Sequence, residues 1–536
     1  VEAGALPASA EVAADEPAPG RVFVDLAGDV TAADITLAWR EGYTATELLK
    51  RYTTLGMGPD QGRSAGIEGL LQMARLQGRD PATLPPTRAR PPFVPVAFGT
   101  LAGNDPGPLI RPVRETPVTA WHRERGAVFY ESGANWRRPG YYPRPGESMD
   151  EAVRRECRAV RHAVGVYDSS PLGKFEIAGP DAAAFLERVL ACRVGDLQVG
   201  RGRYAMALRE DGRIFDDGTV FRLDESRYWL SSTAGNADAM ASWLDYARQW
   251  LFRGHLKVLI EPVGAQWADI VVCGPRARDL LARLIDPAEH AELSAAAFAF
   301  MRFKTLRVAG IAARVFRVSF TGELSFELCV PASQGLELWH AVMAAGAEWG
   351  IEPVGSEANH VLRIEKGFLS LGHEVDGDTN PDDLGMAWSV HLDKPDFIGR
   401  RSVLRDRAHP SGRRQLVGLE CADDGPPFEE GAQVLEAQAT LIAGQCRSMG
   451  LVTASVASEA VGRPIALALI EDGRSLIGQT LQITQSRPLR APGELPGAGA
   501  RVDAVRPGEP VIGLTLRPAR VVAPIFLDPA GGRMRG

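Results

Sequence analysis

YAMALREDGRIFDDGTV, residues 204–220, predicts a strand, a tight turn and a second strand. The turn contains Gly212, and glycine takes the positive φ of a tight turn without steric cost. Asp216 and Asp217 follow as neighbours, so their side chains point to opposite faces of the second strand. One carboxylate can stay hydrated while the other enters a partly apolar pocket and becomes a tunable proton acceptor. An Asp-Asp-Gly sequence is more often a solvated turn, so this hairpin alone identifies no site.

The composition is that of an ordinary globular chain. Its 536 residues suggest three or four domains, and 45% of them are hydrophobic. The net charge is −7 with no Lys/Arg-rich run, so we expect no nucleic-acid partner. No apolar run approaches the roughly 18 residues of a membrane span, so we expect no membrane association. The six cysteines and nine histidines lack metal-ligand spacing, which predicts reduced thiols, no metal site and a cytoplasmic location.

Composition also divides the chain into five segments. Residues 1–20 are rich in Ala, Pro and acids, which indicates a linker from something upstream. A proline-rich stretch with many aromatic and Arg side chains follows a set of short amphipathic helices, and we expect it to contact a partner surface. The predicted segments are a linker at 1–20, a small helical domain at 21–90, a connector at 91–147, an α+β domain at 148–410 and a β-rich domain at 411–536.

Two similar strand-turn-helix units suggest an internal duplication. Each has a Gly-Pro turn between a strand and a helix, at Gly179-Pro180 and at Gly274-Pro275. After Gly412 the predicted strands are short and frequent, which favours a small barrel or sandwich.

Several ordered motifs resemble the folate-dependent aminomethyltransferase family, whose best-known member is the T-protein of glycine cleavage. YDSSPLG at 167–173 resembles its D-x-S-H-M-G loop, and FTGELSFE at 320–327 resembles Y-T-G-E-D-G-F-E. LRIEKGF at 362–368 resembles the L-R-L-E-x-G helix, and GLVT at 450–453 with GRPIAL at 462–467 resembles the terminal barrel. The resemblance covers about residues 150–530 and implies an α+β fold of two related subdomains plus a C-terminal β-barrel.

A second resemblance covers the whole chain. VFVDLAGDVTAADITLAWREG at 22–42, NWRRPGYYP at 135–143 and EKGFLSLGHEVDG at 365–377 are similar to the C-terminal half of the alpha subunits of heterotetrameric sarcosine oxidases and related N-demethylating oxidases. Residues 30–76 occupy the place of an iron–sulfur-type helical domain but contain no cysteine, so they hold no cluster.

The oxidase resemblance implies partners and cofactors. The upstream half of those subunits is a dinucleotide-binding module, and this chain has no GxGxxG of its own. We therefore expect FAD, FMN and NAD on partner chains or on the missing upstream module, and a flavin-containing beta subunit among the partners. The chain is then either a naturally split subunit or a fragment.

The family resemblance assigns the bound tetrahydrofolate to this chain and suggests its contacts. Asp217, with Asp216 as the alternative, stabilises an iminium cation and accepts the proton of N5. Glu327 accepts the N–H groups of the pterin edge, although a surface glutamate is the plainer interpretation.

Further residues surround that ligand in the same interpretation. Tyr204 stacks on the ligand or hydrogen-bonds to it, and Leu172 and Phe320 form an apolar wall. Thr233 and Asn236 reach the ligand or cap the next helix. Asn359 stands where the family has an arginine that contacts the folate tail.

The favoured function is the folate-binding part of a flavin-dependent sarcosine-type oxidase, which passes the oxidised one-carbon unit to tetrahydrofolate and yields 5,10-methylenetetrahydrofolate. One alternative is a stand-alone aminomethyltransferase of the glycine-cleavage type. Another is a non-catalytic folate-binding scaffold subunit.

Overall fold

The computed structural model describes residues 21–91, 96–103, 113–252, 256–409, 412–423, 425–439, 447–488 and 512–536. The chain divides into two compact units, Val1–Pro112 and Val113–Gly536, and each is described by itself. The predicted linker at 1–20 lies outside the described residues.

The first unit is a small helical domain. Thr31 caps helix α1 through a reciprocal capping box, in which Asp34 accepts a hydrogen bond from the Thr31 backbone N–H. Ile35, Leu49 and Met73 come from three different helices and meet in its core. The elements are β1 (Phe23–Asp25), β2 (Val30–Thr31), α1 (Ala32–Arg40), α2 (Thr46–Thr53), α3 (Gly66–Gln77) and α4 (Phe98–Ala102).

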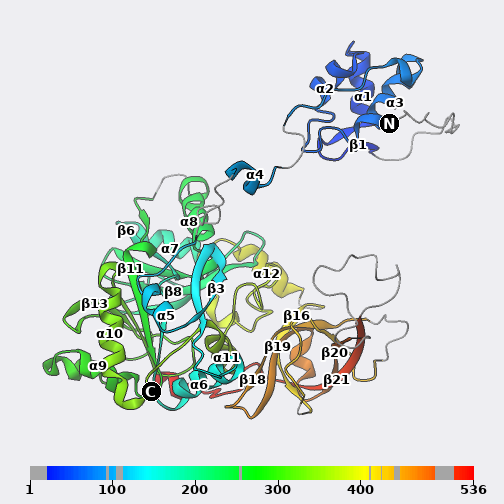
Figure 1. Ribbon diagram of the computed structural model, residues 1–536. Helices are drawn as coiled ribbons and strands as arrows, with labels where there is room; N and C mark the ends of the chain where they lie inside the picture. The colour runs from blue at the N-terminus through cyan, green and yellow to red at the C-terminus, as the bar shows by residue number, and fades with distance from the viewer. Residues whose placement is uncertain are drawn as a thin grey trace. The chain divides into compact units, whose positions relative to one another are not determined.

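The second unit contains two mainly antiparallel sheets and a barrel, as Figure 1 shows. The first sheet has the order β10 (Leu259–Pro262), β6 (Gly173–Ala178), β9 (Arg227–Ser232), β8 (Ile214–Arg222) and β7 (Gly202–Leu208). The second has the order β12 (Phe303–Val308), β13 (Ile311–Phe316), β14 (Ser325–Pro331), β11 (Trp267–Cys273), β5 (Gly165–Asp168) and β15 (Glu352–Pro353). The closed barrel has the order β16 (Arg414–Cys421), β19 (Arg463–Glu471), β18 (Gly450–Ser458), β17 (Gln433–Leu435), β20 (Thr480–Pro488) and β21 (Ile512–Val522).

Helices cover one face of each sheet because their apolar sides pack into its core. The first sheet packs against α7 (Ala182–Val189) and α8 (Ala237–Tyr246), and the second against α9 (Ala277–Leu284) and α10 (Gly335–Ala345). The remaining elements of this unit are α5 (Thr119–Glu124), the hairpin β3 (Val128–Ser132) and β4 (Trp136–Tyr141), α6 (Met149–His162), α11 (Ser356–Lys366), α12 (Arg400–Ala408) and α13 (Gly532–Arg535).

The two Gly-Pro turns are built alike. Gly179 has φ 130° and Gly274 has φ 123°, and each precedes the helix that covers its own sheet. A Cβ would lie 2.4 Å from the Lys257 carbonyl oxygen at Gly179, and 2.6 Å from the Ala163 carbonyl oxygen at Gly274. Glycine is required at both turns for the same reason, which supports the predicted duplication.

An aromatic layer joins the uncovered faces of the two sheets. Phe221 on β8 contacts Phe316 on β13 with ring centroids 4.8 Å apart. Arg314 lies over Trp229 and Trp267 at 5.0 and 4.4 Å from their ring centroids. The predicted fold, with two related α+β subdomains followed by a barrel and preceded by a small helical domain, is therefore confirmed.

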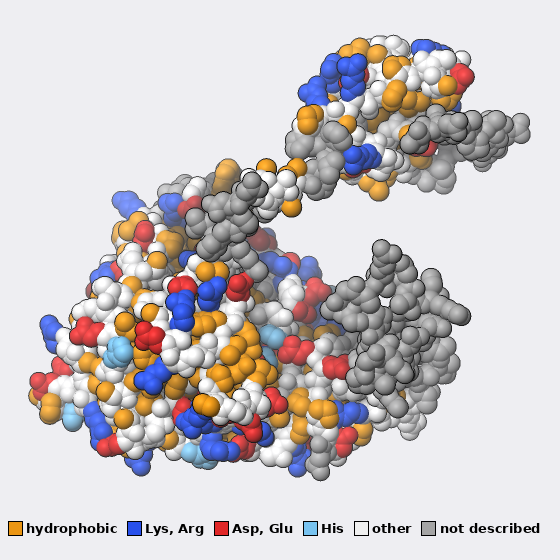
Figure 2. All heavy atoms as spheres, viewed as in Figure 1, with side chains coloured by type: hydrophobic (Ala, Val, Ile, Leu, Met, Phe, Trp, Pro, Cys, Tyr) orange, Lys and Arg blue, Asp and Glu red, His pale blue; other side chains and the backbone are white. Residues whose placement is uncertain are grey.

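The described part of residues 113–147 belongs to the second unit. Trp121, Trp136 and Tyr142 are buried within the chain itself, whereas Tyr130 is exposed. On the face shown in Figure 2, basic and acidic side chains of this unit are interspersed. Among the described residues, no helix is both long and apolar enough to cross a bilayer.

A buried guanidinium ties these elements together. Arg161 on α6 donates to Glu365 on α11 at 2.9 Å and to Glu323 at 2.9 Å. Ser458 at the end of β18 donates to the other oxygen of Glu365 at 2.6 Å, and Arg533 donates to Glu323 at 2.8 Å. Helices, second sheet, barrel and C-terminal segment therefore meet at one ion-paired cluster.

We expect Arg161→Leu to lower the stability of the second unit by about 3–5 kcal/mol, because two buried carboxylates lose the guanidinium that they share. The matched control is Arg158→Leu on the same helix, since the pair of Arg158 with Glu459 is exposed and should contribute at most about 1 kcal/mol. Urea unfolding followed by tryptophan fluorescence measures both. Equal shifts of the two midpoints would contradict the assignment.

Candidate functional site

Asp217 and Tyr204 form a hydrogen-bonded pair on neighbouring strands. The Tyr204 hydroxyl donates to Asp217 Oδ2 at 2.8 Å, and both side chains are half-buried. Burial, and next the charge of Asp216, raises the pKa of Asp217 to about 7, although the Tyr204 hydrogen bond opposes the shift. Among the described residues Asp217 accepts no other side-chain hydrogen bond, so acceptor capacity remains.

Asp216 has a different environment on the opposite side of β8. It is fully buried, and its carboxylate accepts from the Asp217 backbone N–H at 2.8 Å, the Thr233 N–H at 3.3 Å and Asn236 Nδ2 at 3.1 Å. Burial raises the pKa of Asp216, and these hydrogen bonds lower it. Asp216 thus fixes the backbone beside Asp217, and neither Thr233 nor Asn236 caps helix α8 with its side chain.

Asp217 and Glu327 lie on the two sheet faces that meet at the aromatic layer. Alternation along β8 places Asp217 on the same face as Phe221, and alternation along β14 places Glu327 on the same face as Cys329. Phe221 and Cys329 belong to one core cluster between the sheets. Two hairpins far apart in the sequence therefore direct their carboxylates toward a common layer.

Glu327 is half-buried, and its carboxyl group makes no hydrogen bond within the described part of the chain. Burial raises its pKa to about 8; the neighbouring Asp269 adds to the shift and Lys174 opposes it. Lys174 and Asp269 are themselves buried and paired at 3.2 Å, and Asp269 Oδ1 has no hydrogen-bond partner. One lysine thus faces two carboxyl groups, so the cluster favours holding a proton.

Lys174 also anchors the loop that carries Leu172. Its Nζ donates to the carbonyl oxygens of Ser169, Ser170 and Leu172, each at 3.2 Å. The Leu172 side chain is half-buried, so a fixed loop presents an apolar side chain at the end of β5.

The remaining predicted residues are more peripheral. Phe320 is 41% exposed and stacks on Phe368 with ring centroids 6.3 Å apart. Asn359 lies on α11, and its Oδ1 is sealed from solvent without a hydrogen-bond donor. The structure brings Tyr204, Asp216, Asp217, Thr233 and Asn236 into one connected cluster. Within the described residues, no hydrogen bond, ion pair or ring contact joins Phe320 or Asn359 to it.

Several polar residues of this region were missed by the sequence interpretation. Lys174 and Asp269 adjust Glu327, and Asp168 accepts from Thr116 at 2.5 Å and lies 3.3 Å from His122. The available signal was a lysine at the second position of the strand GKFEIA. The sequence gives no signal for Thr116 or His122, because only the tertiary fold brings these residues to Asp168.

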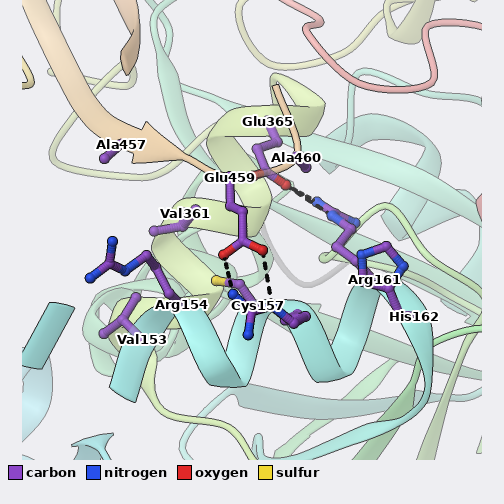
Figure 3. Close-up of a pocket in the computed structure, with 11 residues that line it drawn as sticks. Val153, Arg154, Cys157, Arg161, His162, Val361, Glu365, Ala457, Glu459 and Ala460 are labelled. Carbon is purple, nitrogen blue, oxygen red and sulfur yellow. Dashed lines mark hydrogen bonds and ion pairs between the residues drawn. The ribbon is translucent and has the colours of Figure 1, made fainter. Parts of the chain in front are cut away.

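A cavity of about 230 Å³ lies elsewhere, between α6, α11 and the end of β18. Figure 3 shows Glu459 reaching over α6 and Arg161 pairing with Glu365. The partner of Glu459 on α6 is Arg158. None of the predicted site residues lines this cavity. Its charges largely compensate one another, which fits a structural junction.

Comparison with known proteins gives three family matches along the chain. The GCVT N-terminal domain matches residues 118–394, and the glycine cleavage T-protein C-terminal barrel domain matches residues 414–493. The sarcosine oxidase A3 domain matches residues 19–104.

Curated relatives fall into two groups. Sarcosine oxidase subunit alpha of Corynebacterium sp. (strain U-96) is 43% identical over 464 residues, which cover 86% of this chain and 47% of that protein. The chain spans about half the length of such relatives. An aminomethyltransferase of Symbiobacterium thermophilum is 33% identical over 382 residues, which cover 71% of this chain and 95% of that protein.

A solved structure agrees in fold. The glycine cleavage system aminomethyltransferase T from Bartonella henselae superposes with a TM-score of 0.62 at 24% identity, over 78% of this chain and 99% of that one. The resemblance inferred from the motifs is thus confirmed: the chain belongs to the glycine cleavage T-protein family of aminomethyltransferases.

Proposed function

We propose that this chain is the folate-binding part of a flavin-dependent sarcosine-type oxidase and transfers an oxidised one-carbon unit to tetrahydrofolate. The observation that carries the proposal is the pair Asp217 and Glu327. Both are half-buried carboxyl groups on facing sheet surfaces, and both retain acceptor capacity. Such acceptors suit a flat ligand edge rich in N–H donors, as a pterin has.

The residues divide the chemistry between them. Tetrahydrofolate, when bound, supplies N5 as the nucleophile for the one-carbon unit. Asp217 accepts a proton and stabilises a nearby cationic carbon, since its pKa of about 7 suits a general base at neutral pH. Asp216, Thr233 and Asn236 hold the backbone that carries Asp217. Glu327 accepts ligand N–H groups, and Leu172 covers the ring.

The similarity to sarcosine oxidase alpha subunits over 86% and 96% of this chain supports the oxidase assignment over a stand-alone aminomethyltransferase. The match of residues 19–104 to the sarcosine oxidase A3 domain points the same way. A flavin-containing partner subunit, FAD, FMN and NAD on partner chains or on an upstream module, and a cytoplasmic location belong to this proposal. A non-catalytic scaffold is the alternative that the following experiment separates.

In the complex purified with its partners, Asp217→Asn should reduce methylenetetrahydrofolate formation by about 10²–10⁴-fold, because the proton acceptor is lost. Amine oxidation should continue and release formaldehyde, which a colorimetric assay measures beside the folate product. Glu225→Gln, a change at a 90% exposed side chain on the β8–β9 turn, is the control and should leave both products unchanged. A scaffold would release formaldehyde in the unmodified complex too.

The folate-coupled rate should also depend on pH. The base is the ionised Asp217, so coupling should fall about tenfold per unit below its pKa of about 7 and level off above it. The ratio of methylenetetrahydrofolate to oxidised amine, measured across this range, tests the expectation. A ratio that stays constant through pH 7 would rule out Asp217 as the titrating base.

A further inference from the structure

Arg138 on β4 is an arginine without a partner. Its side chain makes no hydrogen bond, ion pair or ring contact among the described residues, and its Nε is sealed from solvent. Burial lowers the pKa of its guanidinium, and the charges of Asp168 and Glu357 only partly oppose this. A desolvated cation without a counter-ion is costly to keep, so the site is arranged for an anion that the chain does not supply.

The hairpin that carries Arg138 is fixed at both ends. At its tip, Gly133 lies so close to Gly235 that an added Cβ would be 2.5 Å from the Gly235 Cα. At its base, a Cβ on Gly355 would be 2.0 Å from the Gly140 carbonyl oxygen. The tip therefore contacts the turn that holds Asp216, and the base contacts the start of α11. Arg138 lies between these two contacts on an immobilised strand.

Two carboxylates, Asp168 and Glu357, lie within electrostatic reach of Arg138, and neither forms an ion pair with it. Asp168 accepts hydrogen bonds from Thr116 and the Ser170 N–H and lies beside His122. It is also the residue directly before the loop 169–172, which presents Leu172. Arg138 therefore lies within electrostatic reach of Asp168, the residue before the loop of the candidate ligand site, but is not paired with it.

We propose that Arg138 binds a carboxylate of the ligand that this site takes, namely the glutamate tail of tetrahydrofolate. The inference rests on the proposed function for the choice of ligand. A guanidinium offers a planar fork of donors that matches a carboxylate in bidentate geometry. Asn359, on the helix against which β4 packs, carries no charge of its own, so Arg138 is the cation for the tail.

The test compares two ligands on the full chain with its partners: tetrahydrofolate, and 6-methyltetrahydropterin, which lacks the tail. Arg138→Gln should weaken tetrahydrofolate binding by about tenfold or more, because a charge-assisted hydrogen-bond pair is lost. It should leave 6-methyltetrahydropterin binding unchanged. Anaerobic isothermal titration measures both dissociation constants. Arg138→Lys, which keeps the charge but not the fork, should lie between the unmodified protein and Arg138→Gln.

Arg137→Gln is the matched control, because Arg137 is the next residue on the same strand, points to the other face and lies 3.6 Å from Glu115. It should change neither dissociation constant.

The proposal is overturned if Arg138→Gln weakens the binding of both ligands equally, if it weakens the binding of neither, or if the unmodified protein binds both ligands equally well. Binding of neither ligand by the unmodified protein would instead refute the proposed function. The melting temperature of Arg138→Gln should not fall, since the change removes a half-buried charge that forms no ion pair; a large fall would assign Arg138 a structural role.

Discussion

The buried guanidinium of Arg161 is the interaction on which the second unit depends. It joins α6 to α11 through Glu365 and to the segment before β14 through Glu323. The same two carboxylates accept from Ser458 of the barrel and from Arg533 near the C-terminal end of the chain. Charges taken out of water need all of their partners at once, so this cluster fixes how sheet, helices and barrel fit together.

Because this cluster holds the frame together, other carboxyl groups can remain with few hydrogen-bond donors. Asp216 has several donors, and its role is to hold the strand. Asp217, its neighbour, has one donor, and Glu327 has none among the described residues. Their raised pKa values follow from burial without compensation. Incomplete satisfaction inside an otherwise well-paired fold is the pattern typical of a ligand site.

The hairpin of β3 and β4 adds a third incompletely satisfied group from a segment outside the motifs of the first resemblance. The connector to which the hairpin belongs is rich in Arg and aromatic side chains, which predicted contact with a partner surface. Part of it packs within the chain: Trp121 on α5 meets Trp339 with ring centroids 5.1 Å apart. Arg137 and Arg138 are neighbours of the same type. They lie on opposite faces of the strand, so Arg137 pairs with Glu115 whereas the Arg138 side chain has no ion-pair partner among the described residues.

The sequence by itself determined the hairpin around Gly212, the two Gly-Pro turns and the order of the domains in the family, because each depends on a local backbone requirement or on ordered motifs. It also placed Asp216 and Asp217 on opposite faces, since alternation along a strand is local. Only the tertiary structure decided which of the two is held by Thr233 and Asn236, that Lys174 and Asp269 lie beside Glu327, and that Arg138 lacks a partner. Those outcomes depend on which distant segments exclude water from each charged group, and no local pattern encodes that.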